Sequence, residues 1–477
     1  MGASLLATTA LGAALAAGAG APGAAETAAA GARPVLPMVL CGLVLVATFA
    51  LIAFEVINKV VAALAGAIVT VVIALVLGVY AGPKPYLAVH RFIEHDLGVI
   101  GVIVGTSILV EIAGASGLFH FIAVRLVKLT GGRPERLLPA VFFATIGFVT
   151  FLTIAPGTLI MASLVLVITR ALSDDPRPYI VGLALAANSG ALMTFASGIV
   201  TLMIGTSAGI PYAHFLVVSL PLGLLSAAVA FFWVRLSYRA ELAPHGDPAA
   251  RAAMVARFDE WALVKDRRIF YRSAIILLLT IAGFASAQAL GVGLDFIAMC
   301  GGTAAILFSG FDPEEAIKKV KWPVVLFFVG LFVMIGTVQE TGLLEVLAGA
   351  LLAASGDSVL VAAALLISFS FVLAGLVDNI PTAATLIPMV KTMVARGLAP
   401  EPLWWGLVAA CNLGGNPTPV GSIAAVIALH ALEKERGIKV GWGEYLKVGG
   451  TVTLLQLVLV IAYIFAFREL GLFPRLG

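Results

Sequence analysis

Charged side chains are scarce in this sequence. Only 12% of the 477 residues are Asp, Glu, Lys or Arg, whereas 61% are hydrophobic. Soluble domains carry about 25% charged residues, so this chain has too little polar surface for a water-soluble particle of its size. The formal net charge of +3 is too small to indicate a nucleic-acid partner. The composition predicts an all-α polytopic membrane protein.

Cysteines and enzyme motifs are also rare. Cys41, Cys300 and Cys411 all lie in apolar runs, and they form neither a disulfide framework nor a zinc-site spacing. The chain has no Walker loop, no HExxH motif and no GxSxG nucleophile elbow in a strand–turn–helix context. We therefore expect neither an enzyme nor a cofactor.

The first residues differ from the rest of the chain. Residues 1–32 are nearly all Ala, Gly, Thr and Leu and contain no Lys or Arg. An apolar run before small residues is typical of a cleavable signal peptide, but the basic start of such a peptide is missing. We interpret 1–35 as an N-terminal tail or a weak signal segment.

Long apolar runs fill the remainder, and a membrane helix needs about 20 such residues. Two of the runs are too long for one crossing and contain Pro156 and Pro381. Each of these is either a re-entrant hairpin of two half-helices or two full crossings. The runs lie at 36–54, 60–81, 97–115, 138–172, 179–208, 213–235, 270–290, 294–311, 322–340, 358–395, 403–431 and 446–467.

The two halves of the chain repeat each other. Ser116-Gly117-Leu118 recurs as Thr341-Gly342-Leu343, and Pro156 recurs as Pro381, in both cases 225 positions later. Asn188, Gly190 and Thr194 recur as Asn412, Gly414 and Thr418 after 224 positions. We predict a first repeat at 36–235, a linker at 236–269 and a second repeat at 270–470. Five crossings and one hairpin in each half make the second repeat inverted, which is typical of secondary transporters.

The basic residues predict the orientation. The loop 235–272 carries eight Lys and Arg residues, and cytoplasmic loops are enriched in such residues. If this loop is cytoplasmic and both broken runs are hairpins, 22 of the 29 basic residues lie inside. We expect a multi-pass protein of the cell membrane.

The centre of the second broken run carries an acidic residue. Asp378 is followed by Asn379 and, after Pro381, by Thr382. Carboxylate, amide, hydroxyl and free carbonyl oxygens together suit Na⁺ at Asp378 and Asn379. The carboxylate could instead carry a proton, its pKa raised by burial. A helix cap is the alternative to either role.

Residues 412–422 contain three glycines and two prolines inside an apolar run, so they cannot form a regular helix. Irregular backbone at membrane depth is tolerated where it is buried or lines a cavity, although a kinked packing helix is the alternative. We predict that Asn412, Asn416 and Thr418 contribute to the ion site. We predict substrate contacts from Gly414, Gly415 and Ser422.

The first half contains a weaker version of both elements. Its hairpin has Thr153 and no acid, and its broken helix has Asn188 and Thr194 but no proline. These oxygen and amide groups could hold a neutral or anionic group or a weaker ion. We assign Thr153, Asn188 and Thr194 to substrate binding.

The motifs Val377-Asp378-Asn379-Ile380-Pro381 and Leu413-Gly414-Gly415-Asn416-Pro417-Thr418 resemble those of the ion transporter superfamily. The chain is most similar to the branch of arsenite permeases, sodium/proton antiporters and the melanosomal P-protein, within the citrate-transporter-like fold. This resemblance implies paired scaffold and transport units, ion and substrate sites at hairpin tips and unwound helices, and an elevator-like movement. The first hairpin departs from the pattern, because Thr153-Ile154 replaces an Asp-Asn pair.

These observations predict a Na⁺- or H⁺-coupled secondary transporter for a small ion or anion such as a carboxylate or oxyanion. One alternative is a Na⁺/H⁺ antiporter without an organic substrate. Another is a passive channel or a subunit of the arsenite-efflux type. The expected partners are the lipid bilayer and the small substrate, without nucleic acid, and the architecture allows a homodimer.

The orientation is testable with single cysteines. A cysteine at Ala249, in the basic loop, should be shielded from membrane-impermeant thiol reagents in intact cells. A cysteine at Asp357 should be labelled, because that loop falls on the opposite side. Labelling at Ala249 would reverse the predicted orientation.

Overall fold

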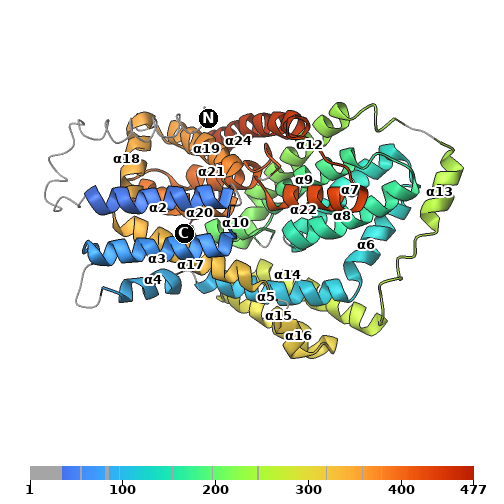
Figure 1. The fold of residues 1–477 in the computed structure, drawn as a ribbon, viewed down its shortest axis with the longest axis horizontal. Coiled ribbons are helices and arrows are strands. Elements are labelled where there is room, and N and C mark those ends of the chain that lie inside the picture. Colours follow the sequence, from blue (N-terminus) through green and yellow to red (C-terminus); the bar gives the residue numbers. More distant parts are fainter. Residues whose placement is uncertain are drawn as a thin grey trace. The chain divides into compact units, whose positions relative to one another are not determined.

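A computed structural model describes residues 35–53, 56–80, 85–95, 97–152, 154–195, 197–243, 246–318, 320–356, 358–377, 379–419 and 421–476. These residues form helices joined by loops and contain no strand (Figure 1). The predicted all-α membrane fold is confirmed. The predicted tail at 1–35 falls outside the described residues except for Val35.

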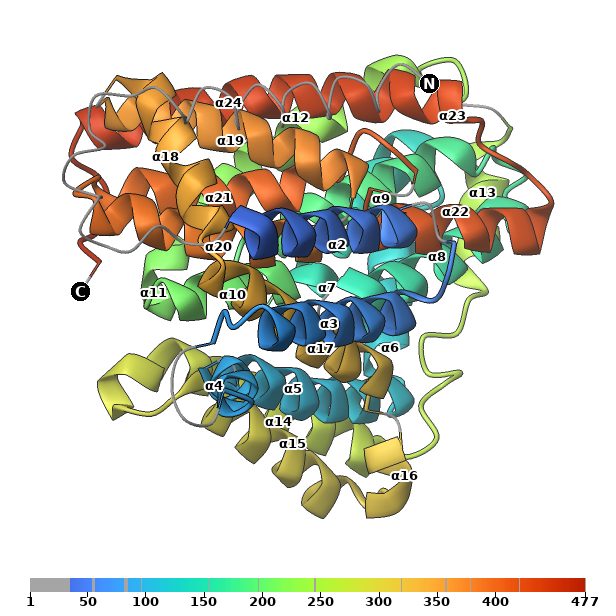
Figure 2. The same ribbon diagram turned by 60° about the vertical axis from the view of Figure 1, so that its left-hand side comes forward.

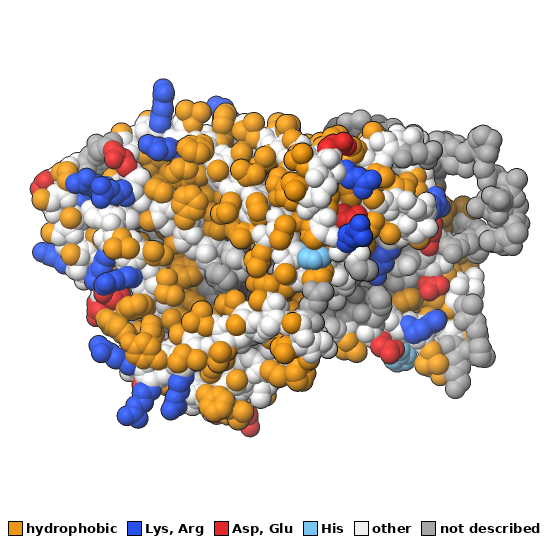
Figure 3. All heavy atoms as spheres, turned by 180° about the vertical axis from the view of Figure 1, so that it is seen from behind, with side chains coloured by type: hydrophobic (Ala, Val, Ile, Leu, Met, Phe, Trp, Pro, Cys, Tyr) orange, Lys and Arg blue, Asp and Glu red, His pale blue; other side chains and the backbone are white. Residues whose placement is uncertain are grey.

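Eight helical segments in the described part of the chain are long and apolar enough to cross a membrane. Their principal helices are α2 (Val35–Ala53), α3 (Lys59–Val76), α5 (Leu97–Ala115), α12 (Leu220–Ser237), α14 (Arg267–Leu290), α17 (Trp322–Glu340), α19 (Val359–Leu376) and α24 (Thr451–Glu469). With the short helices that precede α12 and α24 included, each segment begins within four residues of a predicted run, because about 20 apolar residues match the thickness of the hydrocarbon core. Hydrophobic side chains cover much of the surface visible in Figure 3.

The other predicted runs, apart from 294–311, are broken into shorter helices. These are α7 (Pro134–Leu152) with α8 (Ile154–Ala171), α9 (Arg177–Ala191) with α10 (Ile199–Ser207), α20 (Asn379–Ala395) after α19, and α21 (Pro400–Leu413) with α22 (Ile423–Arg436). In the two predicted hairpins the break precedes the proline. Pro156 and Pro381 are each the third residue of the second helix, where a helix needs no N–H donor.

Shorter helices connect or extend these elements. They are α4 (Leu87–His95), α6 (Leu118–Lys128), α11 (Tyr212–His214), α13 (Pro248–Ala256), α15 (Leu294–Ser309), α16 (Pro313–Lys318), α18 (Leu343–Ser355) and α23 (Trp442–Tyr445). Two π-helical turns, η2 (Phe215–Ser219) and η3 (Leu446–Gly450), lead into α12 and α24.

Local geometry recurs at the spacing of the predicted repeat. Gly117 and Gly342 both precede a helix in the left-handed conformation, with φ of +83° and +86°. The residues before them, Ser116 and Thr341, each donate a hydrogen bond to the carbonyl three positions earlier, at 2.7 and 2.6 Å. Glycine is required at this turn because side chains disfavour positive φ. The inverted relation between the two halves stays a prediction.

The chain packs as two units. The first comprises Met1–Asp96, Leu326–Leu366 and Ala384–Trp404, and the second comprises Leu97–Val325, Ile367–Ala383 and Trp405–Gly477. Each unit contains segments from both halves of the sequence. The boundaries of the packing units therefore differ from those of the predicted sequence repeats. In the first unit, α2 packs on α3, and the hydroxyls of Tyr80 and Thr337 lie 2.7 Å apart.

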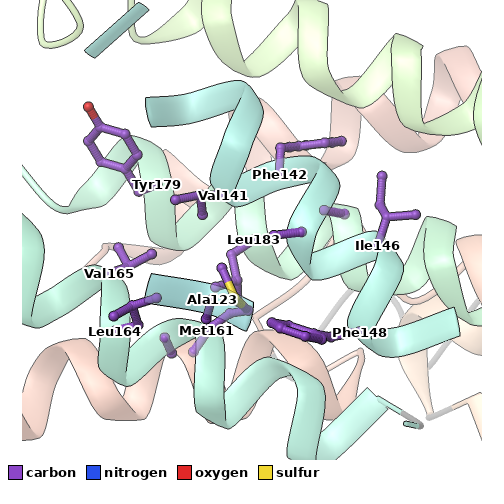
Figure 4. Close-up of a cluster of buried hydrophobic side chains, with 14 of the residues drawn as sticks. Ala123, Val141, Phe142, Ile146, Phe148, Met161, Leu164, Val165, Tyr179 and Leu183 are labelled. Carbon is purple, nitrogen blue, oxygen red and sulfur yellow. The ribbon is translucent and has the colours of Figure 1, made fainter. Parts of the chain in front are cut away.

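The core of the second unit lies between α6, α7, α8 and α9 (Figure 4). Phe142 and Phe148 from α7 and Met161 from α8 are buried there, and Phe148 lies edge-on to Phe119 of α6. Described residues from Pro178 to Ala191 of α9 are all buried. A helix that is apolar on every side has its position fixed by packing, and this packing holds the polar end of α9 in place.

A buried ion pair ties the central linker to the same unit. Arg251 of α13 donates two hydrogen bonds to the carboxylate of Asp174, at 2.8 and 2.7 Å, and a third to the carbonyl of Gly132 at 2.8 Å. These bonds raise the pKa of Arg251, so it stays charged. The linker predicted at 236–269 is therefore held against the rest of the second unit through α13.

Breaking this ion pair should destabilise the protein. Arg251→Met leaves the carboxylate of Asp174 buried with its principal cation removed, and the free energy of unfolding should fall by about 3–5 kcal/mol. Thermal unfolding in detergent measures this loss. Arg257→Met, at an exposed position one residue after α13, is the matched control. Equal stability of the two variants would mean that α13 is not held by this pair.

Candidate functional site

The first broken helix unwinds between α9 and α10. Three side chains replace the lost helical bonds there. The hydroxyl of Ser197 lies 2.5 Å from the carbonyls of Ala191 and Thr194, and that of Thr201 donates to the same Ala191 carbonyl at 2.7 Å. The Thr194 hydroxyl donates to the Thr150 carbonyl at 3.0 Å. Serine and threonine hydroxyls thus open this helix without a proline.

The second broken helix unwinds between α21 and α22, where glycines allow close backbone approach. A Cβ on Gly414 would lie 2.9 Å from Cα of Phe371, and one on Gly421 would lie 2.7 Å from the Gly415 carbonyl oxygen. Ser422 then caps α22 by accepting a hydrogen bond from the Ala425 amide at 3.2 Å. The predicted irregular segment is present.

Thr418 ties this segment to the end of α19. Its hydroxyl donates to the carbonyl of Gly375 at 3.1 Å. The carbonyls of Gly375, Gly415 and Gly421 therefore gather around a short stretch of chain. Main-chain oxygens released from helices in this way are the groups that coordinate ions in transporters with broken helices.

Side chains join the two broken helices directly. The amide of Asn188 donates to Oδ1 of Asn416 at 2.7 Å, and the amide of Asn412 donates to the hydroxyl of Thr201 at 3.0 Å. All four side chains are buried. These two hydrogen-bonded pairs, the asparagine network, each join the first broken helix to the second, and both lie within the second packing unit.

The network continues into α24. The Asn416 amide donates to Oε1 of Gln456 at 2.8 Å, and the Gln456 amide donates to the carbonyl of Ser226 in α12 at 3.0 Å. Gln456 is fully buried. The network thus links four transmembrane elements through amide groups.

Two acceptors in this network lack a donor. Among the described residues, no hydrogen-bond partner reaches Oδ1 of Asn188 or Oδ1 of Asn412, although both side chains are fully buried. A buried acceptor without a partner costs about 1–3 kcal/mol, and such groups in native proteins usually mark an ion, a water or a function. The two atoms occupy equivalent positions in the sequence repeat.

The residues at the second hairpin are described in part. Asn379 is buried, and with its amide nitrogen placed as the donor it bonds to the carbonyls of Cys411 at 3.2 Å and Gly421 at 3.1 Å. Thr382 is fully buried in the first turn of α20. Asp378 and Thr153 lie outside the described residues, so their roles stay predictions.

Both π-helical turns contact the unwound segments. The Ser219 hydroxyl of η2 donates to the carbonyl of Leu192, and a Cβ on Gly449 of η3 would collide with the carbonyl of Asn416. π-helical turns are rare and occur frequently at functional sites. A π-helical turn therefore packs against the unwound segment of each broken helix, η2 against the first and η3 against the second.

Comparison with known proteins shows the family of the chain. A family model described as a citrate transporter matches residues 49–410. The chain belongs to this citrate transporter family. The names of the family and of its relatives indicate a transporter rather than an enzyme.

Relatives of this citrate transporter family member are known by sequence and by structure. An uncharacterized transporter of Mycobacterium tuberculosis is 28% identical, over 78% of this chain and 88% of its own length. An arsenical pump membrane protein of Escherichia coli is 24% identical, over 73% of this chain and 81% of its own length. The crystal structure of the Alcanivorax borkumensis YdaH transporter has a similar fold, with a TM-score of 0.55 at 16% identity, over 80% of this chain and 89% of the other.

The sequence did not predict that Gln456, Thr201 and Ser197 contribute to the site of this citrate transporter family member. Gln456 is detectable as an amide in the middle of an apolar run, since polar residues inside spans are rare and functional. Thr201 and Ser197 give no such signal, because hydroxyls in membrane helices commonly bond to their own backbone.

Glu111, a second acid within a span, lies apart from the asparagine network. It is partly buried in α5. Burial lowers the pKa of Lys321, just before α17, while the negative charge of Glu111 acts in the opposite direction.

Removing the amide of Gln456 should weaken the network. Gln456→Leu leaves the buried Asn416 amide without its acceptor and removes the additional hydrogen bond to the Ser226 carbonyl of α12. The expected cost is about 1–3 kcal/mol of stability for the unpaired amide, measured by thermal unfolding. Val458→Leu, on the exposed side of α24, is the matched control. A stable Gln456→Leu variant with normal transport would remove Gln456 from the site.

Proposed function

We propose that this protein is an ion-coupled secondary transporter for a small carboxylate or oxyanion, with Na⁺ as the preferred coupling ion and H⁺ as the second candidate. One observation supports this proposal above the others. Two broken membrane helices meet through asparagine side chains, and the two equivalent asparagines each present a buried oxygen without a donor.

The chemistry of these oxygens favours a metal cation. An amide oxygen does not take up a proton near neutral pH, but it is a good ligand for a hard cation, as backbone carbonyls are. The proton alternative requires a carboxylate, and Asp378 is the acid that the sequence places at the hairpin break. Na⁺ coupling therefore uses both the asparagine oxygens and Asp378, whereas H⁺ coupling uses Asp378 alone.

The ends of the half-helices support the proposed substrate class. α8, α10, α20 and α22 all begin at breaks within apolar runs, and helix N-termini carry partial positive charge that attracts anions. Gly414, Gly415, Ser422 and Thr194 lie beside these breaks. The family description names citrate and the relatives name arsenicals, so a carboxylate and an arsenic oxyanion are the first substrates to test.

Two alternatives predict different fluxes. A Na⁺/H⁺ antiporter without an organic substrate moves Na⁺ against a proton gradient with no anion present. A passive channel, or a subunit energised by a separate protein, moves anion at a rate that follows the anion gradient alone.

Purified protein in proteoliposomes separates these possibilities. Uptake of radiolabelled citrate or arsenite is measured with an imposed Na⁺ gradient, an imposed pH gradient, both or neither. Na⁺-driven accumulation above the external concentration supports the proposal, and accumulation driven only by protons changes the coupling ion. A flux that is indifferent to both gradients leaves the passive function.

Asp378→Asn tests the coupling residue. The substitution keeps size and hydrogen bonding but removes the charge, so gradient-driven accumulation should be abolished in a folded, membrane-inserted protein. If Asp378 only caps α20, the change should cost little, because Asn and Asp cap helices about equally well.

Thr153→Val is the matched change in the first hairpin and should reduce transport less than Asp378→Asn. Equal losses would show that the first hairpin also binds an essential ion. Normal coupled transport by a well-expressed Asp378→Asn variant would move the coupling role to another acid, with Glu111 the next to test.

A further inference from the structure

A cavity lies between α14 and α15, which pack side by side within the second unit (Figure 2). Its volume is about 560 Å³, and aliphatic side chains form most of its wall, among them Ile275, Leu279, Ile297 and Leu307. Leu279 and Leu307 are 66% and 70% exposed. Since α14 is long and apolar enough to span the membrane, this groove opens toward lipid.

The packing of the two helices explains why the groove exists. At one end α14 and α15 touch closely, because a Cβ on Gly301 would lie 2.8 Å from Cγ2 of Thr280. At the other end Arg272 bridges the helices by donating to the carbonyl of Phe308 at 3.2 Å. The groove is the space between these two contacts.

Arg272 gives the groove a charged end. The bond to Phe308 uses one of the five N–H donors of a guanidinium, and the side chain is exposed. Arg268 is also exposed one turn earlier on the same face of α14. An apolar groove that ends at Arg272, with Arg268 one turn beyond, is complementary to a molecule with a hydrocarbon chain and an anionic head.

We propose that this groove binds one anionic phospholipid, with an acyl chain along α14 and α15 and its phosphate on Arg272. Thr280 lies eight positions after Arg272, a separation of about 12 Å along the helix. This is close to half of a hydrocarbon core of about 30 Å. The lipid therefore belongs to a single leaflet, the one on the side of the linker that precedes α14.

Photoreactive lipids test the site. The full-length protein is placed in phosphatidylcholine nanodiscs that contain a trace of phosphatidylglycerol or phosphatidylcholine with a diazirine on the acyl chain, and labelled peptides are mapped by mass spectrometry. The anionic probe should label the α15 peptide about fivefold more than the zwitterionic probe, as expected for one arginine at the membrane surface.

Variants distinguish the effect of the Arg272 charge on labelling from the effect of the shape of the groove. Arg272→Gln should remove most of this preference, Arg272→Lys should retain it, and Arg468→Gln, at an exposed arginine near the end of α24, should leave it unchanged. Ala304→Phe should reduce labelling by both probes, because Ala304 lines the groove. Size-exclusion chromatography checks that each variant is folded.

Two results would overturn the proposal. One is an unchanged preference for the anionic probe in folded Arg272→Gln protein. The other is oxidative cross-linking of Cys300 between two copies in the membrane. Cys300 is exposed and lines the groove, whereas Cys41 and Cys411 are buried, so a Cys300 cross-link would show that a second copy covers the groove.

Discussion

Every backbone polar group at membrane depth must find a partner inside the protein, because the hydrocarbon supplies none. A continuous helix satisfies this constraint with its own hydrogen bonds, but the two broken helices do not. Their released groups are bound by hydroxyls from Ser197, Thr201 and Thr418 and by the amide of Asn379. The site is therefore costly to build, and the close glycine contacts and π-helical turns around it serve to complete that hydrogen bonding.

Much of the fold was predictable because membrane depth sets helix length. Apolar runs of about 20 residues located the spans within a few residues, and three glycines with two prolines located the unwound segment after α21. The prolines were less informative than expected. Pro156 and Pro381 lie in the first turn of a helix, where proline is tolerated, so each marks the start of a half-helix rather than the break itself.

The pairings within the site could not be predicted. Asn188 meets Asn416 across 228 positions, and Asn412 meets Thr201 across 211. The repeat aligned Asn188 with Asn412 but gave no information about which side chains touch. Gln456 joins the network from α24, where it is the only amide side chain. Such contacts depend on how helices pack, and the spacing of residues along one chain does not encode that.

The two unpartnered oxygens lower the stability of the asparagine network. If each costs about 1–3 kcal/mol when empty, the network is less stable without an occupant than with one. Under the proposed function, an ion bound at these oxygens stabilises the folded protein by an amount that grows with the logarithm of its concentration relative to its dissociation constant. An ion can also shift a conformational equilibrium only by as much as its affinity differs between the two states. Because both hydrogen-bonded pairs lie within a single packing unit, binding of the proposed ion would stabilise that unit rather than one helix alone.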